Sequence, residues 1–428
     1  MKRSLFKDLI SWKNSSNRKP LIIQGARQVG KTWLMKAFGA QEFQQVVYLN
    51  FEESSRLKEL FIPDFDIDRL ITSFEIETNL KIDPENTLLI FDEIQEAEKG
   101  LTALKYFYER RPEYYIIAAG SLLGVSLQNN HSFPVGKVDF LQLFPLSFME
   151  FLENSNEVQL GEQLNNENWP LLETFHDKLI QNLRLYYYLG GMPAVIADYL
   201  KNKDLNAVRE IQNKLLIGYE NDFAKYAPIE IVPKIKMIWH SLMSQLAKEN
   251  KKFIYGQIKN GARAKDFEAA INWLVDAGLV LKVNRVEKPT MPLKAYADYD
   301  AFKLFLFDIG LLNAMGELDQ KILLEKNAIL KEYKGALTEQ FVCQQLFPKK
   351  ELFYWSASNA TAEVDFVIQH QNEIIPIEVK AEENLKSKSL KVYVDKFKPE
   401  TTYRTSMSKF RKDDWLTNVP IYGISTIV

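Results

Sequence analysis

An octet near the N-terminus has the residue types and the spacing of a phosphate-binding loop. Glycines stand at positions 25 and 30, and Lys31 and Thr32 follow the second glycine directly. In this pattern, backbone N–H groups turn inward around phosphate oxygens, the lysine reaches the β- and γ-phosphates, and the threonine hydroxyl ligates Mg²⁺. We therefore expect ATP and Mg²⁺ as ligands, the alternative being a glycine-rich turn without one. The residues expected to contact the nucleotide are Gly25, Ala26, Arg27, Gln28, Val29, Gly30, Lys31, Thr32 and Trp33.

A second group of polar residues follows two apolar runs further along the chain. The run at 88–91 ends in Asp92 and Glu93, and Ser121 follows the run at 115–119. At the carboxyl edge of a sheet, Asp92 can hold Mg²⁺ and Glu93 can orient or deprotonate the attacking water. Ser121 could contact the γ-phosphate, although a serine in a Gly-Ser turn is usually only part of the turn. The predicted catalytic residues are thus Lys31, Glu93 and Ser121, the predicted metal ligands are Thr32 and Asp92, and we expect the strand of Asp92 to adjoin the strand before the loop.

Phosphoryl transfer also requires a cation on the developing charge, and a neighbouring subunit often supplies it as an arginine. Arg110, Arg111 and Arg184 are candidates in this chain. Each is equally compatible with an ordinary surface or salt-bridging role, so the sequence does not choose among them.

The elements that position these residues follow from the hydrophobic pattern. Continuous apolar runs at 21–23, 46–49, 88–91 and 115–119 alternate with polar helical segments, which predicts an α/β domain around a buried parallel sheet. Residues 145–240 are helical in pattern, with a turn at 190–193. Three short helical patterns, the third at 266–276, and a strand at 279–283 then outline a winged helix.

The predicted winged helix is locally basic in a chain of formal net charge -2. Residues 248–294 hold ten Lys or Arg against five Asp or Glu, and Lys259, Arg263 and Lys265 precede the third helix. Phosphate contacts from this position would bind DNA. A solvated charged face, or a protein-binding winged helix, is the alternative.

Composition indicates a reducing compartment. Cys343 is the one cysteine among 428 residues, which excludes an internal disulfide, and the four histidines have no zinc-like spacing. Charges at Lys7, Asp8 and Lys13 interrupt what a signal peptide would need as an apolar stretch. We expect a cytoplasmic protein that does not cross a membrane.

Charged residues also gather near the C-terminus. Strands are expected around 351–355, 363–369 and 374–380 after a helix at 333–346. Side chains alternate along a strand, so Glu363 and Asp365 share one face, and Glu378 shares a face with Lys380. Glu339, in the helix, would lean over these residues.

This arrangement resembles the PD-(D/E)xK nuclease core. The resemblance implies that Asp365 and Glu378 bind Mg²⁺, that Glu339 assists, and that Lys380 positions the attacking water. Val364 stands where this core usually has a proline. The alternative is a nuclease-like fold that binds without cleaving.

Several motifs taken in order resemble one family. They are residues 18–32, Phe91 to Gln95, Ala119 to Ser121, Leu143 to Phe151 and Gly190 to Pro193. The set resembles the AAA+-type ATPases of bacteria and archaea that carry a C-terminal domain of unknown function, over nearly the whole chain. This family usually has Gly-Arg where this chain has Gly136-Lys137, and lysine lacks the planar fork of an arginine finger.

The sequence thus predicts an α/β protein in four regions: an AAA+-like ATPase core at 1–150, a helical lid or linker at 151–239, a winged-helix-like domain at 240–318 and a PD-(D/E)xK nuclease-like domain at 319–428. The leading hypothesis is an ATPase that couples its nucleotide state to a DNA-facing C-terminal half. Two alternatives remain open: an ATP-gated protein-binding scaffold with an inert nuclease-like domain, and an ATP-licensed Mg²⁺-dependent DNA nuclease. Self-association is compatible with each of them.

Overall fold

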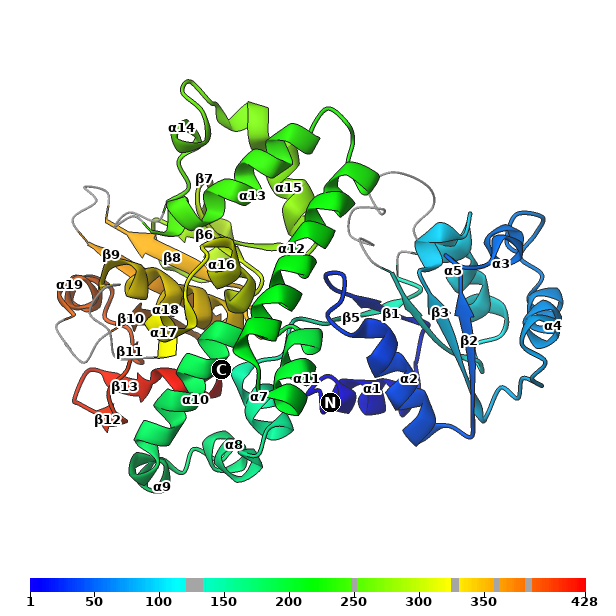
Figure 1. Ribbon diagram of the computed structural model, residues 1–428, viewed down its shortest axis with the longest axis horizontal. Helices are drawn as coiled ribbons and strands as arrows, with labels where there is room; N and C mark the ends of the chain where they lie inside the picture. Colours follow the sequence, from blue (N-terminus) through cyan, green and yellow to red (C-terminus); the bar gives the residue numbers. More distant parts are fainter. Residues whose placement is uncertain (121–133, 135, 248–251, 325–330, 358–361, 382–386) are drawn as a thin grey trace. The chain divides into compact units, whose positions relative to one another are not determined.

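The computed structural model describes the 428 residues except 121–133, 135, 248–251, 325–330, 358–361 and 382–386 (Figure 1). Contacts divide the chain into two compact units. Unit 1 comprises residues 1–144 with 276–278, and unit 2 comprises residues 145–275 with 279–428. Within the described part of the chain, no helix is both long enough and apolar enough to cross a membrane.

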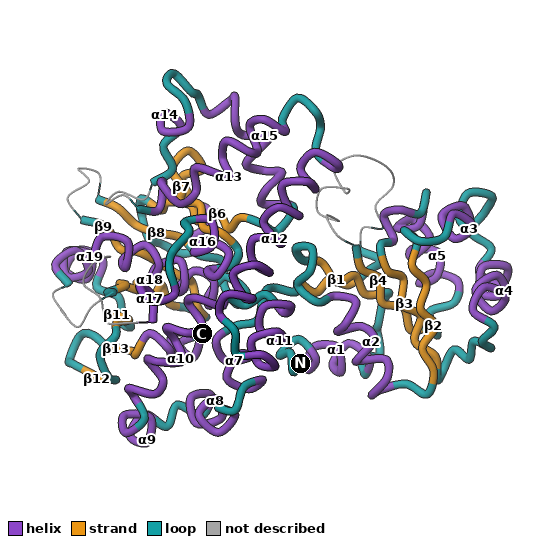
Figure 2. Tube along the Cα trace, in the orientation of Figure 1, coloured by secondary structure: helices purple, strands orange, loops and turns teal. Residues whose placement is uncertain are grey.

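Unit 1 is an α/β unit around a parallel sheet of five strands (Figure 2). The apolar runs expected as strands are confirmed as strands. In chain order the elements are α1 (Phe6–Lys13), β1 (Leu21–Gln24), α2 (Lys31–Glu42), β2 (Gln45–Asn50), α3 (Ser55–Glu59), α4 (Ile67–Thr78), β3 (Thr87–Asp92), a 3₁₀ turn (Ile94–Glu96), α5 (Gly100–Arg110), β4 (Tyr115–Ala119) and β5 (Asp139–Gln142).

The strand order β2-β3-β4-β1-β5 corrects one expectation about the site. β3, which ends at Asp92, does not adjoin β1, because β4 pairs with both of them. The prediction of an adjoining strand was wrong because pairing between parallel strands is set by crossovers and not by sequence distance. The carboxyl ends of these parallel strands nevertheless lie at the same edge of the sheet.

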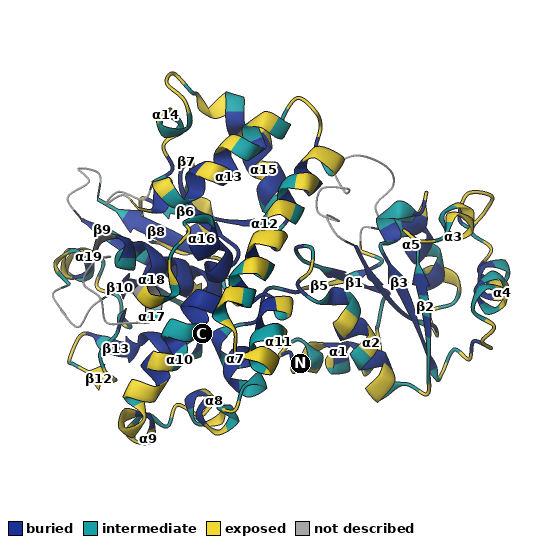
Figure 3. Cartoon of the chain, viewed as in Figure 1, coloured by how far each residue is buried: buried dark blue, intermediate teal, exposed yellow. Residues whose placement is uncertain are grey.

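Burial explains why the central strands read as uninterrupted apolar runs. All six residues of β3 are buried, and so are the last four of β4 (Figure 3). α4 and α5 pack against the sheet with apolar faces that contribute Leu70, Phe74 and Phe107 to the core around Phe91. Strands covered on both faces need no polar alternation.

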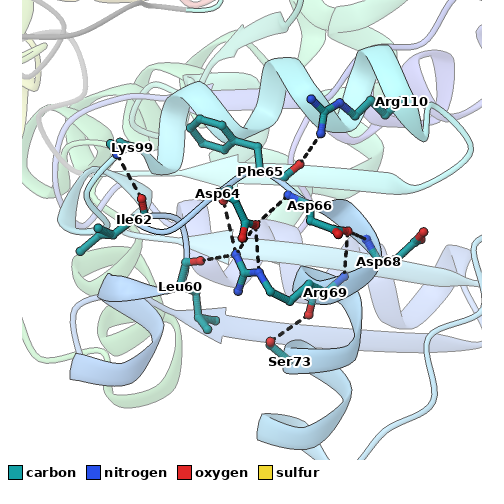
Figure 4. Close-up of polar contacts among 10 residues, drawn as sticks. All are labelled: Leu60, Ile62, Asp64, Phe65, Asp66, Asp68, Arg69, Ser73, Lys99 and Arg110. Atoms are coloured by element: carbon teal, nitrogen blue, oxygen red, sulfur yellow. Dashed lines mark hydrogen bonds and ion pairs between the residues drawn. The ribbon is translucent and has the colours of Figure 1, made fainter.

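A polar network fixes the loop between α3 and α4 (Figure 4). Arg69 donates to the side chain of Asp64 at 2.9 Å and to the carbonyl of Leu60 at 2.9 Å. Arg110, from the end of α5, donates to the carbonyl of Phe65 at 2.8 Å. The basic side chains therefore satisfy loop carbonyls that have no partner in a helix or strand.

Unit 2 begins with a helical region and continues into a mixed sheet. The helices are α7 (Phe148–Asn154), α8 (Val158–Asn165), α9 (Trp169–Thr174), α10 (His176–Leu189), α11 (Pro193–Asn202), α12 (Leu205–Tyr226), α13 (Val232–Leu246), α14 (Tyr255–Ile258), α15 (Ala264–Asp276), α16 (Ile309–Met315), α17 (Gln320–Leu324), α18 (Lys331–Leu346) and α19 (Lys388–Phe397). Short 3₁₀ segments lie at Leu293–Tyr296 and Ile421–Ile427.

The sheet of unit 2 has eight strands in the order β12-β13-β11-β10-β9-β8-β6-β7. They are β6 (Val280–Val286), β7 (Ala297–Leu306), β8 (Phe353–Ser356), β9 (Glu363–His370), β10 (Glu373–Val379), β11 (Tyr403–Ser406), β12 (Arg411–Lys412) and β13 (Thr417–Pro420). β9 and β10 are antiparallel, as the hairpin prediction required.

The elements expected for a winged helix occur in the expected order, with α13, α14 and α15 followed by the antiparallel pair of β6 and β7. β6 also pairs with β8, so this pair belongs to the same sheet as the C-terminal strands. The overall α/β class and the parallel sheet of the phosphate-binding-loop type are confirmed. The four region boundaries, the winged helix and the nuclease-like core stay predictions.

A buried carboxylate joins the turn after α10 to the start of α16. Asp308 accepts a hydrogen bond from the backbone N–H of Gly191 at 2.6 Å and caps α16 by accepting from Leu311 N–H at 3.0 Å. Gly190 has φ +72°, and a β-carbon there would lie 2.2 Å from the Asp308 carboxylate. The predicted turn at residues 190–193 therefore needs glycine because the carboxylate comes so close.

Candidate functional site

The phosphate-binding loop lies between β1, which ends at Gln24, and α2, which begins at Lys31. Gly25 has φ +147°, and a β-carbon on it would lie 2.2 Å from the carbonyl oxygen of Leu143. Gln28 and Gly30 also have positive φ angles, of 64° and 96°. Alternation of this kind turns successive N–H groups toward one side, as an anion cradle requires.

Lys31 is the first residue of α2, and its side chain returns over the loop. Its Nζ donates to the carbonyl oxygens of Gly25 at 2.8 Å and Ala26 at 2.9 Å. The residue is only 6% exposed. Burial lowers the pKa of Lys31 to about 8, against the opposing effect of Glu93 and Asp92. The loop thus holds a desolvated cation, which attracts phosphate more strongly than an exposed one.

Asp92, the last residue of β3, accepts hydrogen bonds from two hydroxyl groups. Thr32 Oγ1 donates to Asp92 Oδ2 at 2.7 Å, which joins the two predicted metal ligands directly. Tyr48, on β2, donates to the same oxygen at 2.9 Å. Burial, followed by the charge of Asp92, raises the pKa of Tyr48, so this hydroxyl keeps its proton. Sequence reasoning missed Tyr48, although a hydroxyl at the end of an apolar strand was an available signal.

Glu93 follows β3 in a left-handed conformation with φ +51°. This backbone is uncommon for a residue with a side chain, and such positions often serve function. Gln95, two residues on, donates from Nε2 to Glu93 Oε2 at 2.6 Å. The amide therefore fixes the orientation of the predicted catalytic carboxylate.

These residues fit a magnesium–nucleotide ligand. A threonine hydroxyl and a carboxylate are hard oxygen donors, which Mg²⁺ prefers, and it usually takes few protein ligands besides phosphate and water. They lie beside a lysine and a loop with left-handed glycines, so cation and phosphate would be held in one place.

The N-terminal segment supports the loop from outside. Arg3 is 8% exposed, and its Nη1 donates to the carbonyl of Val29 at 3.0 Å. Its other terminal nitrogen donates to the carbonyl of Phe144, beyond β5. Sequence reasoning did not identify Arg3, because nothing local relates residue 3 to residue 29.

The other predicted nucleotide contacts lie where the motif places them along the chain. Ala26 and Val29 are buried, Arg27 is half-buried and Gln28 is exposed. Trp33, in the first turn of α2, is 49% exposed. Ser121 lies outside the described residues.

The candidate cations of unit 1 contact acidic or carbonyl groups of the same unit. Lys137, which stands where the resembled family usually has arginine, pairs with Glu109 at 3.0 Å. Arg110 donates to the Phe65 carbonyl (Figure 4). Arg111 pairs with Asp68 and Glu113. In unit 2, Arg184 is a half-buried residue of α10.

The charged residues predicted near the C-terminus interact in pairs. Lys380 Nζ lies 2.6 Å from Glu378 Oε1. Asp365 Oδ2 accepts a hydrogen bond from the backbone N–H of Val379 at 2.8 Å. Burial raises the pKa of Glu378, Lys380 opposes this, and Glu339 adds to it. The predicted strand faces therefore bring these charges within reach of one another.

The cluster contains a residue that sequence reasoning did not place there. Lys303, on β7, is fully buried, and its Nζ lies 2.5 Å from Glu363 Oε1 and 3.7 Å from Glu339 Oε2. A single lysine inside the apolar run 302–307 was the available signal. Among the residues that the structure describes, no three carboxylate, histidine or cysteine side chains are grouped as metal ligands. The Mg²⁺ site that the resemblance implies at Asp365 and Glu378 stays a prediction.

Comparison with family models gives three matches along the chain. Residues 17–152 match the model described as AAA domain. Residues 180–322 and 334–423 match two models described as domains of unknown function, DUF8612 and DUF4143. No curated protein sequence matches the chain.

Two solved structures align over most of the chain. A Walker-type ATPase of Pyrococcus abyssi has 15% identity and a TM-score of 0.45, over 74% of this chain and 95% of that chain. The ORC1 protein of Aeropyrum pernix, solved in complex with DNA, has 10% identity and a TM-score of 0.27, over 73% and 90% of the two chains. At these values neither protein's function transfers to this chain. Residues 17–152 thus match an AAA domain model and contain a loop with the geometry of a phosphate-binding loop.

Proposed function

We propose that this chain binds Mg²⁺–ATP at residues 25–33, hydrolyses it, and couples its nucleotide state to a DNA-facing C-terminal half. The observation that carries the first part is the direct bond from Thr32 to Asp92 beside the buried Lys31. Lys31 binds the β- and γ-phosphates, and Glu93, oriented by Gln95, holds a water and accepts its proton. Mg²⁺, held by Thr32 and Asp92, would neutralise charge on the phosphates.

The test compares three variants for ATP binding and for phosphate release. Lys31→Ala should lose binding, because the desolvated ammonium is removed. Glu93→Gln should still bind ATP but release phosphate at least about 100-fold more slowly, as loss of a general base usually does. Lys81→Ala removes an exposed lysine of the same unit and should behave as wild type. Turnover by Lys31→Ala at the wild-type rate would refute the proposal.

The DNA-facing role is supported by local charge. Lys259, Arg263 and Lys265 are exposed and lie between α14 and the first turn of α15. Because each neutralised phosphate releases counterions, such contacts make affinity fall steeply with salt.

Duplex binding should therefore be measured over a salt series, with ATP and with ADP. Changing all three residues to glutamine should reduce the slope of log affinity against log salt by up to about 2.7, at ~0.9 per contact. A control of equal charge change is Lys201→Gln, Lys203→Gln and Lys214→Gln, all exposed in unit 2. An unchanged slope in the first triple variant would exclude this surface. Absence of salt-sensitive DNA binding in wild type would favour a protein partner instead.

Self-association would allow a second copy of the chain to supply the cation that phosphoryl transfer requires. Lys137, Arg110 and Arg111 each contact another group of unit 1. A cation supplied by a second copy would make phosphate release per chain rise with protein concentration. Turnover that is constant over a wide concentration range would argue for a monomeric ATPase.

A further inference from the structure

The carboxylates around β9 and β10 lie beside a lysine that comes from a different part of the fold. Lys303 belongs to β7, one of the two edge strands of the eight-stranded sheet, and its side chain is fully buried. Burying an ammonium is strongly unfavourable unless carboxylates surround it. The surrounding acids are therefore the reason that this lysine can be inside.

Those acids come from two elements. Glu363, at the start of β9, lies 2.5 Å from Lys303 Nζ, and Glu339, on α18, lies 3.7 Å away. Burial alone would lower the pKa of Lys303, but Glu339, Glu363 and Asp365 together raise it. Lys303 thus lies as an ammonium beside these carboxylates.

Hydrogen bonds from two glutamines of α18 set this helix against β7, the strand that carries Lys303. Gln340, next to Glu339 on α18, accepts from the N–H of Leu306 at 3.0 Å and donates to the carbonyl of the same residue. Gln344 accepts from Ile309 N–H at 2.8 Å, at the start of α16. α18 is therefore bonded along the edge of β7, which sets Glu339 beside Lys303.

Lysine and metal exclude one another at such a place. Mg²⁺ and Mn²⁺ require several oxygen ligands at short distance, and the Lys303 ammonium, which lies beside Glu363 and Glu339, takes up their negative charge and repels a second cation nearby. Glu378 Oε1 is engaged by Lys380, and Asp365 Oδ2 by Val379 N–H. One oxygen of each predicted ligand is thus bound by the chain itself, whereas Glu378 Oε2 is buried without a hydrogen-bond partner among the described residues.

We propose that Lys303 is the resident cation of this carboxylate cluster and stands in place of a divalent metal, so that the C-terminal unit holds its nuclease-like residues without binding metal there. This inference does not depend on ATP hydrolysis in unit 1. It separates the two alternatives for the C-terminal half, because metal-dependent cleavage at Asp365 and Glu378 would require a divalent cation close to the Lys303 ammonium.

The test measures Mn²⁺ binding to the full chain by electron paramagnetic resonance, without nucleotide. All variants carry Asp92→Asn, so that the phosphate-binding loop contributes no metal ligand from that carboxylate. The chain with Lys303 should bind no Mn²⁺ at concentrations up to on the order of 1 mM, where millimolar-affinity sites begin to fill. Lys303→Met should bind about one Mn²⁺, and its melting temperature should rise with Mn²⁺ by ~2 °C or more.

Two further variants keep the result decisive. Lys303→Met with Asp365→Asn should lose the acquired Mn²⁺, because a cluster ligand is removed. Lys303→Arg keeps a cation and should bind no Mn²⁺.

The proposal is overturned if the chain with Lys303 binds one Mn²⁺ that Asp365→Asn abolishes. It is equally overturned if folded Lys303→Met binds none. If Lys303→Met does not fold, the chains with lysine and arginine still decide the question, since Mn²⁺ bound at the cluster in either contradicts a resident cation.

Discussion

Protonation of Asp308 should make the stability of unit 2 depend on pH in a predictable direction. Burial raises the pKa of Asp308 to about 6 from 3.8, although hydrogen bonds from Gly191, Leu311 and Gln344 act in the opposite direction. The folded state therefore binds this proton more tightly than the unfolded state. The contribution is fully present below pH 3.8, and it is lost as the pH rises through 6.

The magnitude follows from the two pKa values. The whole shift corresponds to about 3 kcal/mol, at ~1.4 kcal/mol per pH unit. Between pH 5 and 7.5 the free energy of unfolding should fall by about 1.4 kcal/mol on account of this group. Asp308→Asn removes the titration, and it also replaces one accepting oxygen by a donor. The variant should therefore be less stable at both pH values, by about 1–3 kcal/mol.

Urea unfolding at pH 5, 6 and 7.5 measures these quantities. The difference between wild type and Asp308→Asn should shrink as the pH rises, because only wild type loses stability through Asp308. Asp204→Asn is a control, since it removes the exposed carboxylate that caps α12 through Asn206 and Ala207. If wild type and Asp308→Asn depend on pH in parallel from 5 to 7.5, Asp308 does not titrate in this range and the reasoning fails.

Two further outcomes concern the nucleotide site. Gly25→Ala places a β-carbon against the Leu143 carbonyl at a φ that alanine rarely adopts. Urea unfolding should show a free energy of unfolding lower by about 1–3 kcal/mol, and equilibrium titration should show ATP binding weaker by at least about tenfold. An unchanged affinity for ATP would show that the loop tolerates the alanine side chain. Tyr48→Phe removes one donor to Asp92 while the ring stays, so stability should fall by about 1–2 kcal/mol in the same urea assay. A Tyr48→Phe protein as stable as wild type would mean that water replaces the hydroxyl.

Local pattern was sufficient for much of unit 1. The glycines at 25 and 30 and the apolar runs at 88–91 and 115–119 predicted a loop and strands that the structure confirms. The reason is physical: a left-handed turn needs glycine where a carbonyl approaches, and a strand covered on both faces must be apolar throughout. Lys31 and Thr32 are neighbours in the first turn of α2, so their place beside the loop could also be predicted from the local sequence.

The prediction for the charged residues near the C-terminus was only partly confirmed. Alternation along β9 and β10 correctly placed Glu363 and Asp365 on the less buried face. It did not show what neutralises them, because Lys303 arrives from β7, sixty residues earlier than Glu363. The metal site implied by resemblance therefore stays a prediction, which Mn²⁺ binding to the Lys303 variants tests.

The phosphate-binding loop and most strands could be predicted from the amino-acid sequence, since both depend on neighbours along the chain. The tertiary structure alone decided the strand order, which puts β4 between β1 and β3, and the partners of the buried charges. Pairing between strands and the burial of an ion are set by groups distant in sequence. An ammonium such as Lys303 can be buried only where acids from other elements meet it.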